Sequence, residues 1–244
     1  MRRAPVPIAI LLAILPLAAC GKDEPLGAGE KAAAGATATT ATATSTTSLP
    51  PRTVRDGCEP VATPGPSTDP ERRRSRRKLD PKRDHVAVLR TNCGTIRILL
   101  AVRRAPKTTA SFAGLVRNGF YDGLTFHRIA KPGGNDYVIQ GGDPLGDGNG
   151  GPGYSVVEKP SRRTRYQRGT VAMAKTAEDK PGTSGSQFFI VTAPRAPLPP
   201  DYAPLGRITG GQGVVRRIAR LQTDAVTEMP VDPVVMQRVT IERR

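Results

Sequence analysis

Short runs of apolar residues, separated by glycine and proline, dominate the chain after about residue 84. Residues 85–90 and 95–99 are two runs rich in aliphatic and β-branched side chains, and turn-forming residues at 92–94 lie between them. This pattern predicts a β-hairpin. Five more runs predict further strands, at residues 137–140, 170–174, 187–192, 205–208 and 234–241.

Two other segments have the spacing of amphipathic helices. The first has Pro106 in its first turn, an apolar face that includes Phe112 and Leu115, and an Asn-Gly end at residues 118–119. The second covers residues 214–221, where apolar residues again share one face. Many short strands with two helices predict a mainly β domain over residues 84–244, built as a closed antiparallel barrel that the helices cap.

The first 19 residues have the layout of a signal peptide. Two arginines precede an apolar stretch of 14 residues, at 6–19, which is too short to span a bilayer comfortably. The stretch leads into Leu-Ala-Ala-Cys-Gly, which resembles the lipobox of bacterial lipoproteins, in which the cysteine, here Cys20, carries the lipid. Several acyl chains, palmitate among them, anchor a protein stably. We therefore expect an extracytoplasmic protein, lipid-anchored to the cell membrane; an ordinary secretory signal is the alternative.

Residues 20–83 are predicted to form a disordered tether between this lipid and the domain. Of the 16 residues at 32–47, 14 are Ala or Thr, a composition that cannot bury enough apolar surface to offset its ordering entropy. A basic run follows at residues 72–78. It predicts either contact with anionic headgroups or wall polymers, or a solvated linker with no such role.

Charge and cysteine content narrow the expected partners. Lys and Arg number 37 against 21 Asp and Glu, a net charge of +16, which favours acidic partners or an anionic envelope. The export signal argues against a nucleic-acid partner. Two His and three Cys lack the spacing of a zinc site, so no metal is expected. With Cys20 lipidated, Cys58 and Cys93 remain, and export allows either a disulfide between them or two free thiols.

Nucleotide-dependent and hydrolytic chemistry find no support in the motifs. Residues 146–151 match Gly-x-Gly-x-x-Gly, but Pro152 follows where a dinucleotide site needs a helix to begin. The sequence has neither a Walker loop nor a Gly-x-Ser-x-Gly elbow. No cofactor is therefore expected.

A more specific signal is a set of motifs in a fixed order. Phe-His-Arg-Ile stands at 126–129, Val-Ile-Gln-Gly-Gly-Asp-Pro at 138–144 and Ser-Gly-Ser-Gln-Phe-Phe-Ile at 184–190. Over roughly residues 84–244 the chain thereby resembles the cyclophilin family of peptidyl-prolyl cis-trans isomerases. The resemblance implies a closed eight-stranded antiparallel barrel with two capping helices. It also implies a shallow groove on the outer surface that binds a peptide around an X-Pro bond.

The resemblance carries the family's site residues onto this sequence. Arg128 matches the catalytic arginine, whose fixed positive charge can hydrogen-bond the prolyl nitrogen once the twisted amide has lost its conjugation. The other matching positions are expected to bind substrate: Tyr137, Val138, Gln140, Gly148, Ala174, Lys175, Gln187, Phe189, Leu198 and Tyr202.

The sequence departs from the family's pattern in two ways. The link at residues 131–136 is longer than usual and could reshape the rim of the groove. The position of the family's indole donor holds Pro197, and the chain has no Trp. Because that indole binds cyclosporin, we expect weak cyclosporin affinity.

The sequence therefore favours a monomeric, lipid-anchored isomerase that acts on proline-containing segments of exported proteins. One alternative is a non-catalytic module that binds proline peptides on the same barrel. Another is a surface protein in which the basic tether and basic domain matter more than the groove.

Overall fold

The computed structural model describes residues 57–65 and 77–244, all within one unit of the chain, Leu49–Arg244. The predicted signal peptide, the lipid-bearing Cys20 and most of the predicted tether lie outside the described residues. The predicted domain over residues 84–244 falls wholly inside them.

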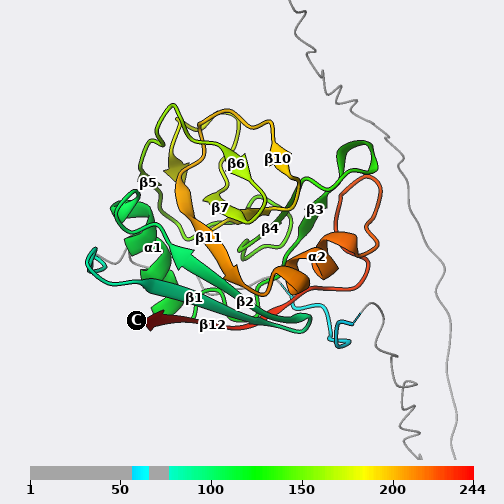
Figure 1. Ribbon diagram of the computed structural model, residues 1–244. Helices are drawn as coiled ribbons and strands as arrows, with labels where there is room; N and C mark the ends of the chain where they lie inside the picture. The colour runs from blue at the N-terminus through cyan, green and yellow to red at the C-terminus, as the bar shows by residue number, and fades with distance from the viewer. Residues whose placement is uncertain (1–56, 66–76) are drawn as a thin grey trace, which may run out of the picture. The chain divides into compact units, whose positions relative to one another are not determined.

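The predicted hairpin opens the domain. Strands β1 (His85–Thr91) and β2 (Gly94–Leu100) pair antiparallel, and Gly94 makes the turn with a φ of 120°. The last strand, β12 (Met236–Arg243), pairs antiparallel with the other side of β1. The chain's first and last strands therefore lie side by side (Figure 1).

The main sheet has eight strands in the order β12-β1-β2-β11-β7-β9-β4-β3, and every pair is antiparallel. Its other members are β3 (Arg128–Ala130), β4 (Val138–Gly141), β7 (Thr170–Met173), β9 (Phe188–Val191) and β11 (Pro204–Gly210). Two small sheets accompany it, formed by β5 (Val156–Val157) with β8 (Thr183–Ser184) and by β6 (Tyr166–Gln167) with β10 (Arg195–Ala196). The prediction of a mainly β, antiparallel domain is confirmed.

The predicted closure of the barrel is wrong, because the sheet is open. Its edge strands, β3 and β12, do not pair with each other. The gap is crossed by the isolated bridge of Thr125 with Val235, by three backbone hydrogen bonds between residues 123–126 and 234–236, and by one from the Ile129 N–H to the Glu228 carbonyl. The sequence explains the opening: β3 is only three residues long, and Pro230 and Pro233 lack the N–H that a continuing ladder would need. The loop after the second helix therefore lies against β3.

Both predicted helices form. Helix α1 (Pro106–Arg117) begins with its proline, buries Phe112 and Leu115 and ends at Asn118. Glu158 closes its first turn by accepting the backbone N–H groups of Lys107 and Thr108, each at 2.9 Å. Helix α2 (Gln212–Arg220) starts two residues earlier than predicted. Within residues 57–65 and 77–244, no helix has the length and apolar character of a membrane span.

Alternate residues of three central strands enter two different apolar clusters, because side chains of a strand alternate between its faces. The inner residues, such as Ile139, Val171 and Ile190, join the main core with α1 and α2. The outer residues form a second group, here called the outer cluster, with partly buried residues at its edge. It consists of Ala130, Val138, Tyr166, Ala172, Phe189, Val191, Ala193 and Ala196, edged by Tyr137, Ala174, Leu198 and Tyr202.

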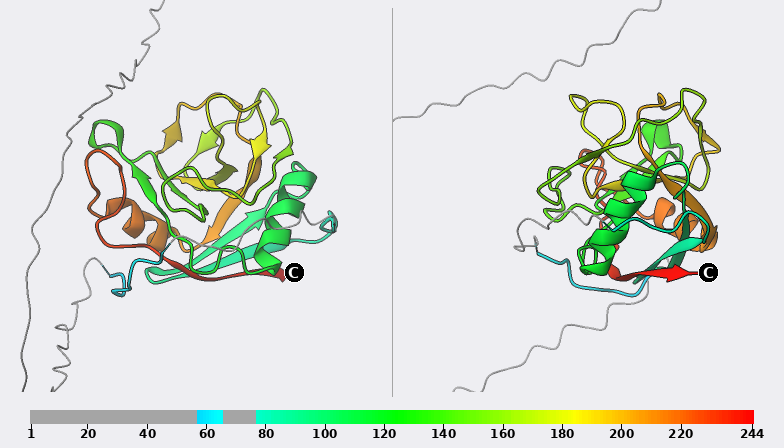
Figure 2. Two further views of the ribbon diagram at one scale, coloured as in Figure 1. Left: turned by 180° about the vertical axis from the view of Figure 1, so that it is seen from behind. Right: turned by 90° about the vertical axis from the view of Figure 1, so that its left-hand side faces the viewer.

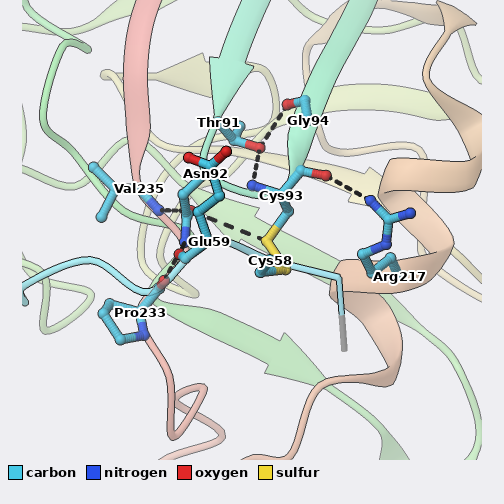
Figure 3. The surroundings of a disulfide bond; sticks show 9 residues. All are labelled: Cys58, Glu59, Thr91, Asn92, Cys93, Gly94, Arg217, Pro233 and Val235. Atoms are coloured by element: carbon cyan, nitrogen blue, oxygen red, sulfur yellow. Dashed lines mark hydrogen bonds between the residues drawn. A yellow bond between two sulfur atoms is a disulfide. The ribbon is translucent and has the colours of Figure 1, made fainter. Parts of the chain in front are cut away.

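A disulfide joins Cys58 to Cys93 at the turn between β1 and β2 (Figure 3). Hydrogen bonds reinforce it, because the Glu59 N–H donates to the Asn92 carbonyl and the Asn92 side-chain amide donates to the Glu59 carbonyl, each at 2.8 Å. From α2, the Arg217 guanidinium donates to the Cys93 carbonyl at 2.8 Å. The segment at residues 57–65 is thus fixed to the hairpin turn.

Candidate active site

Strand register brings the predicted catalytic residue next to the predicted pocket. Arg128 on β3 pairs with Gln140 on β4, Gln140 pairs with Phe189 on β9, and Phe189 pairs with Ala172 on β7. Residues in one register row point to the same face of a sheet. A guanidinium, an amide and an aromatic ring therefore lie in sequence across the outer face.

A chain of hydrogen bonds, here called the polar network, extends from Arg128. Its Nη1 donates to Gln140 Oε1 at 3.4 Å, and Gln140 Nε2 donates to Gln187 Oε1 at 2.9 Å. Gln187 Nε2 in turn donates to the carbonyls of Gly148 and Gly150, at 2.8 and 2.9 Å. Arg128, Gln140, Gln187 and Gly148 were expected at the site separately, and the structure links them directly.

The glycine-rich loop at residues 146–151 closes around Asp143, a buried carboxylate that the sequence analysis did not single out. Asp143 accepts the backbone N–H groups of Leu145 and Gly148. Gly148 has a φ of 93°, and a Cβ on Gly150 would stand 2.0 Å from an Asp143 oxygen. Glycine is therefore required for this loop to fold back onto a carboxylate. This explains the dinucleotide-like spacing without a nucleotide.

The residues predicted to line the proline pocket fall in the outer cluster. Val138 and Phe189 are each 4% exposed. The ring of Tyr202 meets that of Phe189 edge-on, with centroids 5.3 Å apart, a favourable aromatic geometry. Tyr137, Ala174 and Leu198 pack at the partly exposed border. All six of these predicted substrate-binding residues lie in one cluster.

Tyr166 is a site residue that sequence reasoning missed. Its hydroxyl donates to the Tyr202 carbonyl at 2.8 Å and accepts the Tyr202 N–H at 3.0 Å. Burial raises the pKa of Tyr166 to about 12. On the exposed side, Lys175 Nζ lies 5.8 Å from the centroid of the Tyr202 ring, within cation–π range. Tyr202 is therefore fixed through its backbone by Tyr166 and contacted on its ring by Lys175.

A second missed residue is Glu228, in the loop after α2. Arg128 Nε donates to Glu228 Oε2 at 2.6 Å. The two residues are 100 positions apart in sequence, so no local spacing could have suggested the pair. Arg128 thus has a carboxylate on one side and the Gln140 amide on the other.

His127 and the long link between β3 and β4 make no hydrogen bond to the other candidate-site residues that the structure describes. His127 is buried, and in the described part of the chain neither ring nitrogen has a hydrogen-bond partner. Burial lowers the pKa of this imidazole, which keeps it neutral. The link forms a 3-10 turn at Pro132–Gly134, and Lys131 Nζ donates to the Leu221 carbonyl at the end of α2, 2.8 Å away. This fixes the link to α2.

Comparison with known proteins gives the same assignment. Residues 86–241 match the model of a family described as "Cyclophilin type peptidyl-prolyl cis-trans isomerase/CLD". This chain belongs to the cyclophilin family. The expectation of a cyclophilin-type peptidyl-prolyl isomerase is confirmed.

Curated peptidyl-prolyl cis-trans isomerases are similar to this chain in sequence. Peptidyl-prolyl cis-trans isomerase B of Streptomyces anulatus is 36% identical over 176 residues, which cover 65% of this chain and 97% of the relative. Peptidyl-prolyl cis-trans isomerase A of Mycobacterium tuberculosis is 36% identical, with coverage of 64% and 91%. The mouse peptidyl-prolyl cis-trans isomerase-like 1 is 39% identical, with coverage of 60% and 86%.

Solved cyclophilin structures share the fold. A crystal structure of a Cryptosporidium parvum cyclophilin, determined in the presence of the dipeptide Ala-Pro, has a TM-score of 0.58 at 28% identity and covers 64% of this chain and 98% of its own. The cyclophilin assignment therefore stands on motifs, sequence and fold together.

Proposed function

We propose that this cyclophilin isomerises X-Pro bonds with Arg128 as the catalytic donor, while the outer cluster holds the proline ring. The observation that carries this proposal is the register row in which Arg128, Gln140 and Phe189 stand side by side on the outer face. The row sets a charged donor beside an apolar pocket, which is the combination that a proline and its amide need.

The reaction needs no covalent step. Rotation about the X-Pro amide is slow because the C–N bond has double-bond character, with a barrier of about 18–20 kcal/mol. In the twisted amide the prolyl nitrogen regains its lone pair and can accept a hydrogen bond. A donor that meets this lone pair favours the transition state over either ground state.

Arg128 keeps donors for that purpose. A guanidinium has five N–H groups, and among the described residues Glu228 takes Nε and Gln140 takes Nη1. Nη2 has no partner within residues 57–65 and 77–244, and the side chain is 40% exposed. We assign to Nη2 the contact with the prolyl nitrogen, and to Gln140 the contact with the peptide backbone.

The proline ring is assigned to the floor formed by Phe189 and Val138, with Tyr202 and Leu198 as walls. The Cryptosporidium parvum structure, determined in the presence of the dipeptide Ala-Pro, supports a ligand of this kind. Lys175 and Ala174 border the same face, where Ala174 already uses its N–H on the Gln187 carbonyl at 2.9 Å.

Exchange NMR on a short X-Pro peptide tests the proposal, with a chain that begins at residue 20. We expect rapid cis-trans exchange that falls by at least about a hundredfold in Arg128→Ala, the magnitude of one lost transition-state donor. Peptide binding without accelerated exchange would instead identify a non-catalytic proline-peptide module on the same sheet.

We also propose that the protein is exported, anchored through a lipid on Cys20, and acts on exported proteins whose folding waits on slow X-Pro bonds. The apolar stretch and the lipobox-like ending support anchoring, and the Cys58–Cys93 disulfide suits an oxidising compartment. Mass spectrometry of the mature N-terminus tests this. A lipid-bearing Cys20 is expected, and an unmodified secreted chain would point to an ordinary signal peptide.

A basic depression favours a second candidate function, contact with an anionic surface. It has a volume of about 970 Å³ and lies between β2, β11 and the loop after β5. Seven basic residues line it against one acidic residue, Asp84: Arg83, Arg103, Arg104, Lys159, Arg163, Arg165 and Arg207. Salt-sensitive sedimentation with anionic liposomes, unchanged in Arg128→Ala and lost in Arg163→Glu/Arg165→Glu, would support this function.

A further inference from the structure

The loop at residues 222–235 reaches β3 through one residue, Glu228. Its carboxylate accepts from Arg128 Nε at 2.6 Å, and its carbonyl accepts from the N–H of Ile129 at 2.8 Å. Figures 1 and 2 show the loop, in orange-red, running beside β3 and the link that follows it. Glu228 thus holds both the side chain of Arg128 and the backbone of its neighbour.

Glu228 adopts an unfavourable backbone conformation in order to do so. Its φ is 58°, and it is the non-glycine residue with positive φ in the part of the chain that the structure describes. L-residues avoid this region because Cβ approaches backbone atoms. Glycine would adopt this backbone conformation at less cost. The presence of a glutamate instead suggests that its side chain has a function here.

Other bonds within the loop impose this conformation. Asp224 Oδ1 accepts the N–H groups of Val226 and Thr227, at 3.0 and 2.7 Å. The Glu228 N–H donates to the Asp224 carbonyl at 3.1 Å, and the Asp224 N–H donates to the Met229 carbonyl at 2.9 Å. The loop is therefore held by its own hydrogen bonds in a conformation that places the Glu228 carboxylate against Arg128.

We propose that Glu228 is a positioning residue for Arg128. Its carboxylate and the Gln140 amide fix the guanidinium at two different nitrogens and direct Nη2 to the prolyl nitrogen. Without the carboxylate, the 3.4 Å bond to Gln140 is the remaining anchor among the described residues. This inference rests on the proposed function, since it assigns Arg128 the role of donor.

The positioning role can be measured by line-shape exchange of an X-Pro peptide, at low and at saturating peptide, with a chain that begins at residue 20. Glu228→Ala should lower kcat about tenfold and change KM less than about twofold, because a misplaced donor costs rate more than binding. Glu228→Gln keeps an acceptor for Nε and should recover most of that loss. The 15N-edited signal of the Arg128 Nε–H should be sharp in wild type and exchange-broadened in Glu228→Ala.

Two further variants separate positioning from structural support. Glu242→Ala removes a matched ion pair, with Arg97 at 2.7 Å and similar exposure, and should leave kcat unchanged. Glu228→Gly removes the carboxylate and the backbone strain together. Its melting temperature should be higher than that of Glu228→Ala, while its kcat should be no higher. If Glu228 had a purely structural role, the more stable Glu228→Gly would also be the more active variant.

Each contrary result has a distinct meaning. Full kcat in Glu228→Ala beside an inactive Arg128→Ala would overturn the positioning role and leave the proposed function standing. A higher kcat/KM in Glu228→Ala would also overturn it, because the carboxylate would then compete with substrate. Full activity in Arg128→Ala would overturn the proposed function itself, and the positioning role with it. The double variant should lose no more than Arg128→Ala alone.

Discussion

The two faces of β4, β7 and β9 carry different clusters, one that forms the main core and one that we propose binds substrate. On the inner face, Phe188 packs among the rings of Phe112, Tyr121 and Phe126, with centroids 5.8–5.9 Å away. On the outer face its neighbour Phe189 belongs to a smaller cluster that ends in partly exposed side chains. Neighbouring phenylalanines with similar burial therefore belong to different clusters, because they point to opposite faces of the same strand.

The strongest test of this contrast replaces each phenylalanine in turn. Phe188→Ala should destabilise the fold by about 3–5 kcal/mol, because a buried ring leaves a cavity in a close-packed core. Phe189→Ala should cost less, since the outer cluster is small and open at its border, but it should abolish proline-peptide binding. Urea unfolding and peptide titration check the two effects. Equal destabilisation with intact binding in Phe189→Ala would contradict the separation of the faces.

A smaller effect is expected beneath the pocket, at Tyr166. Tyr166→Phe removes both hydrogen bonds to the Tyr202 backbone and should cost about 1 kcal/mol of stability, with KM raised severalfold and kcat nearly unchanged. The pKa of the folded phenol is about 12 and its ordinary value is 10.0. Its contribution to stability is therefore complete below pH 10 and lost as the pH rises through 12. Unfolding measured at pH 9 and pH 11 should show this loss in wild type, and the loss should be smaller in Tyr166→Phe, where Tyr121 and Tyr137, whose pKa values are also raised, still contribute.

A further, modest effect concerns the pH dependence of stability, which we expect to come from the buried imidazole of His127 and not from the pocket. Burial lowers the pKa of His127 below its ordinary 6.5. As the pH falls below 6.5, His127 is protonated in the unfolded chain while it is still neutral in the folded protein. The stability that is present above pH 6.5 is therefore lost as the pH falls toward the lower pKa of the folded state. Urea midpoints between pH 7.5 and 5 should fall in wild type. A His127→Phe variant with the same acid slope would rule out this residue as the cause.

The smallest expected effect concerns cyclosporin. Pro197 is exposed where the family carries an indole, so an N–H donor is missing from the border of the pocket. Inhibition should be weak, and Pro197→Trp should strengthen it without changing kcat. Submicromolar inhibition of the wild-type exchange reaction would contradict this expectation.

Local patterns were enough to predict much of the fold. Two apolar, β-branched runs on either side of the turn residues 92–94 predicted the hairpin, and Pro106 marked the start of α1, because both signals act over a few neighbouring residues. Closure of the sheet was predicted wrongly, since it depends on whether β3 and the last strand meet across the chain. The three-residue strand β3 itself was missed for the same reason: its pairing partners define it.

The residues of the candidate site also fall into those that a local pattern predicts and those that only the folded chain brings together. Arg128, Gln140 and Phe189 could be found because each lies in a short motif that the family shares. Glu228 and Tyr166 carry no such motif and act through partners 100 and 36 positions away. Asp143 stood inside a recognised motif, yet its support of the glycine-rich loop appears only when the chain is folded.

Under the proposed lipid anchor on Cys20, the disulfide would limit how far the domain can lie from the membrane. If Cys20 carries the lipid, Cys58 follows it by 38 positions, and a chain of that length can span at most roughly 130 Å. Reduction of the disulfide, together with loss of the Glu59–Asn92 hydrogen bonds, would move the point of attachment to about Leu79, the next buried residue that the structure describes, and lengthen the span to roughly 200 Å. The volume that the catalyst can search would then grow more than threefold. Under this proposal, one sulfur–sulfur bond helps to set which exported chains the anchored domain can reach.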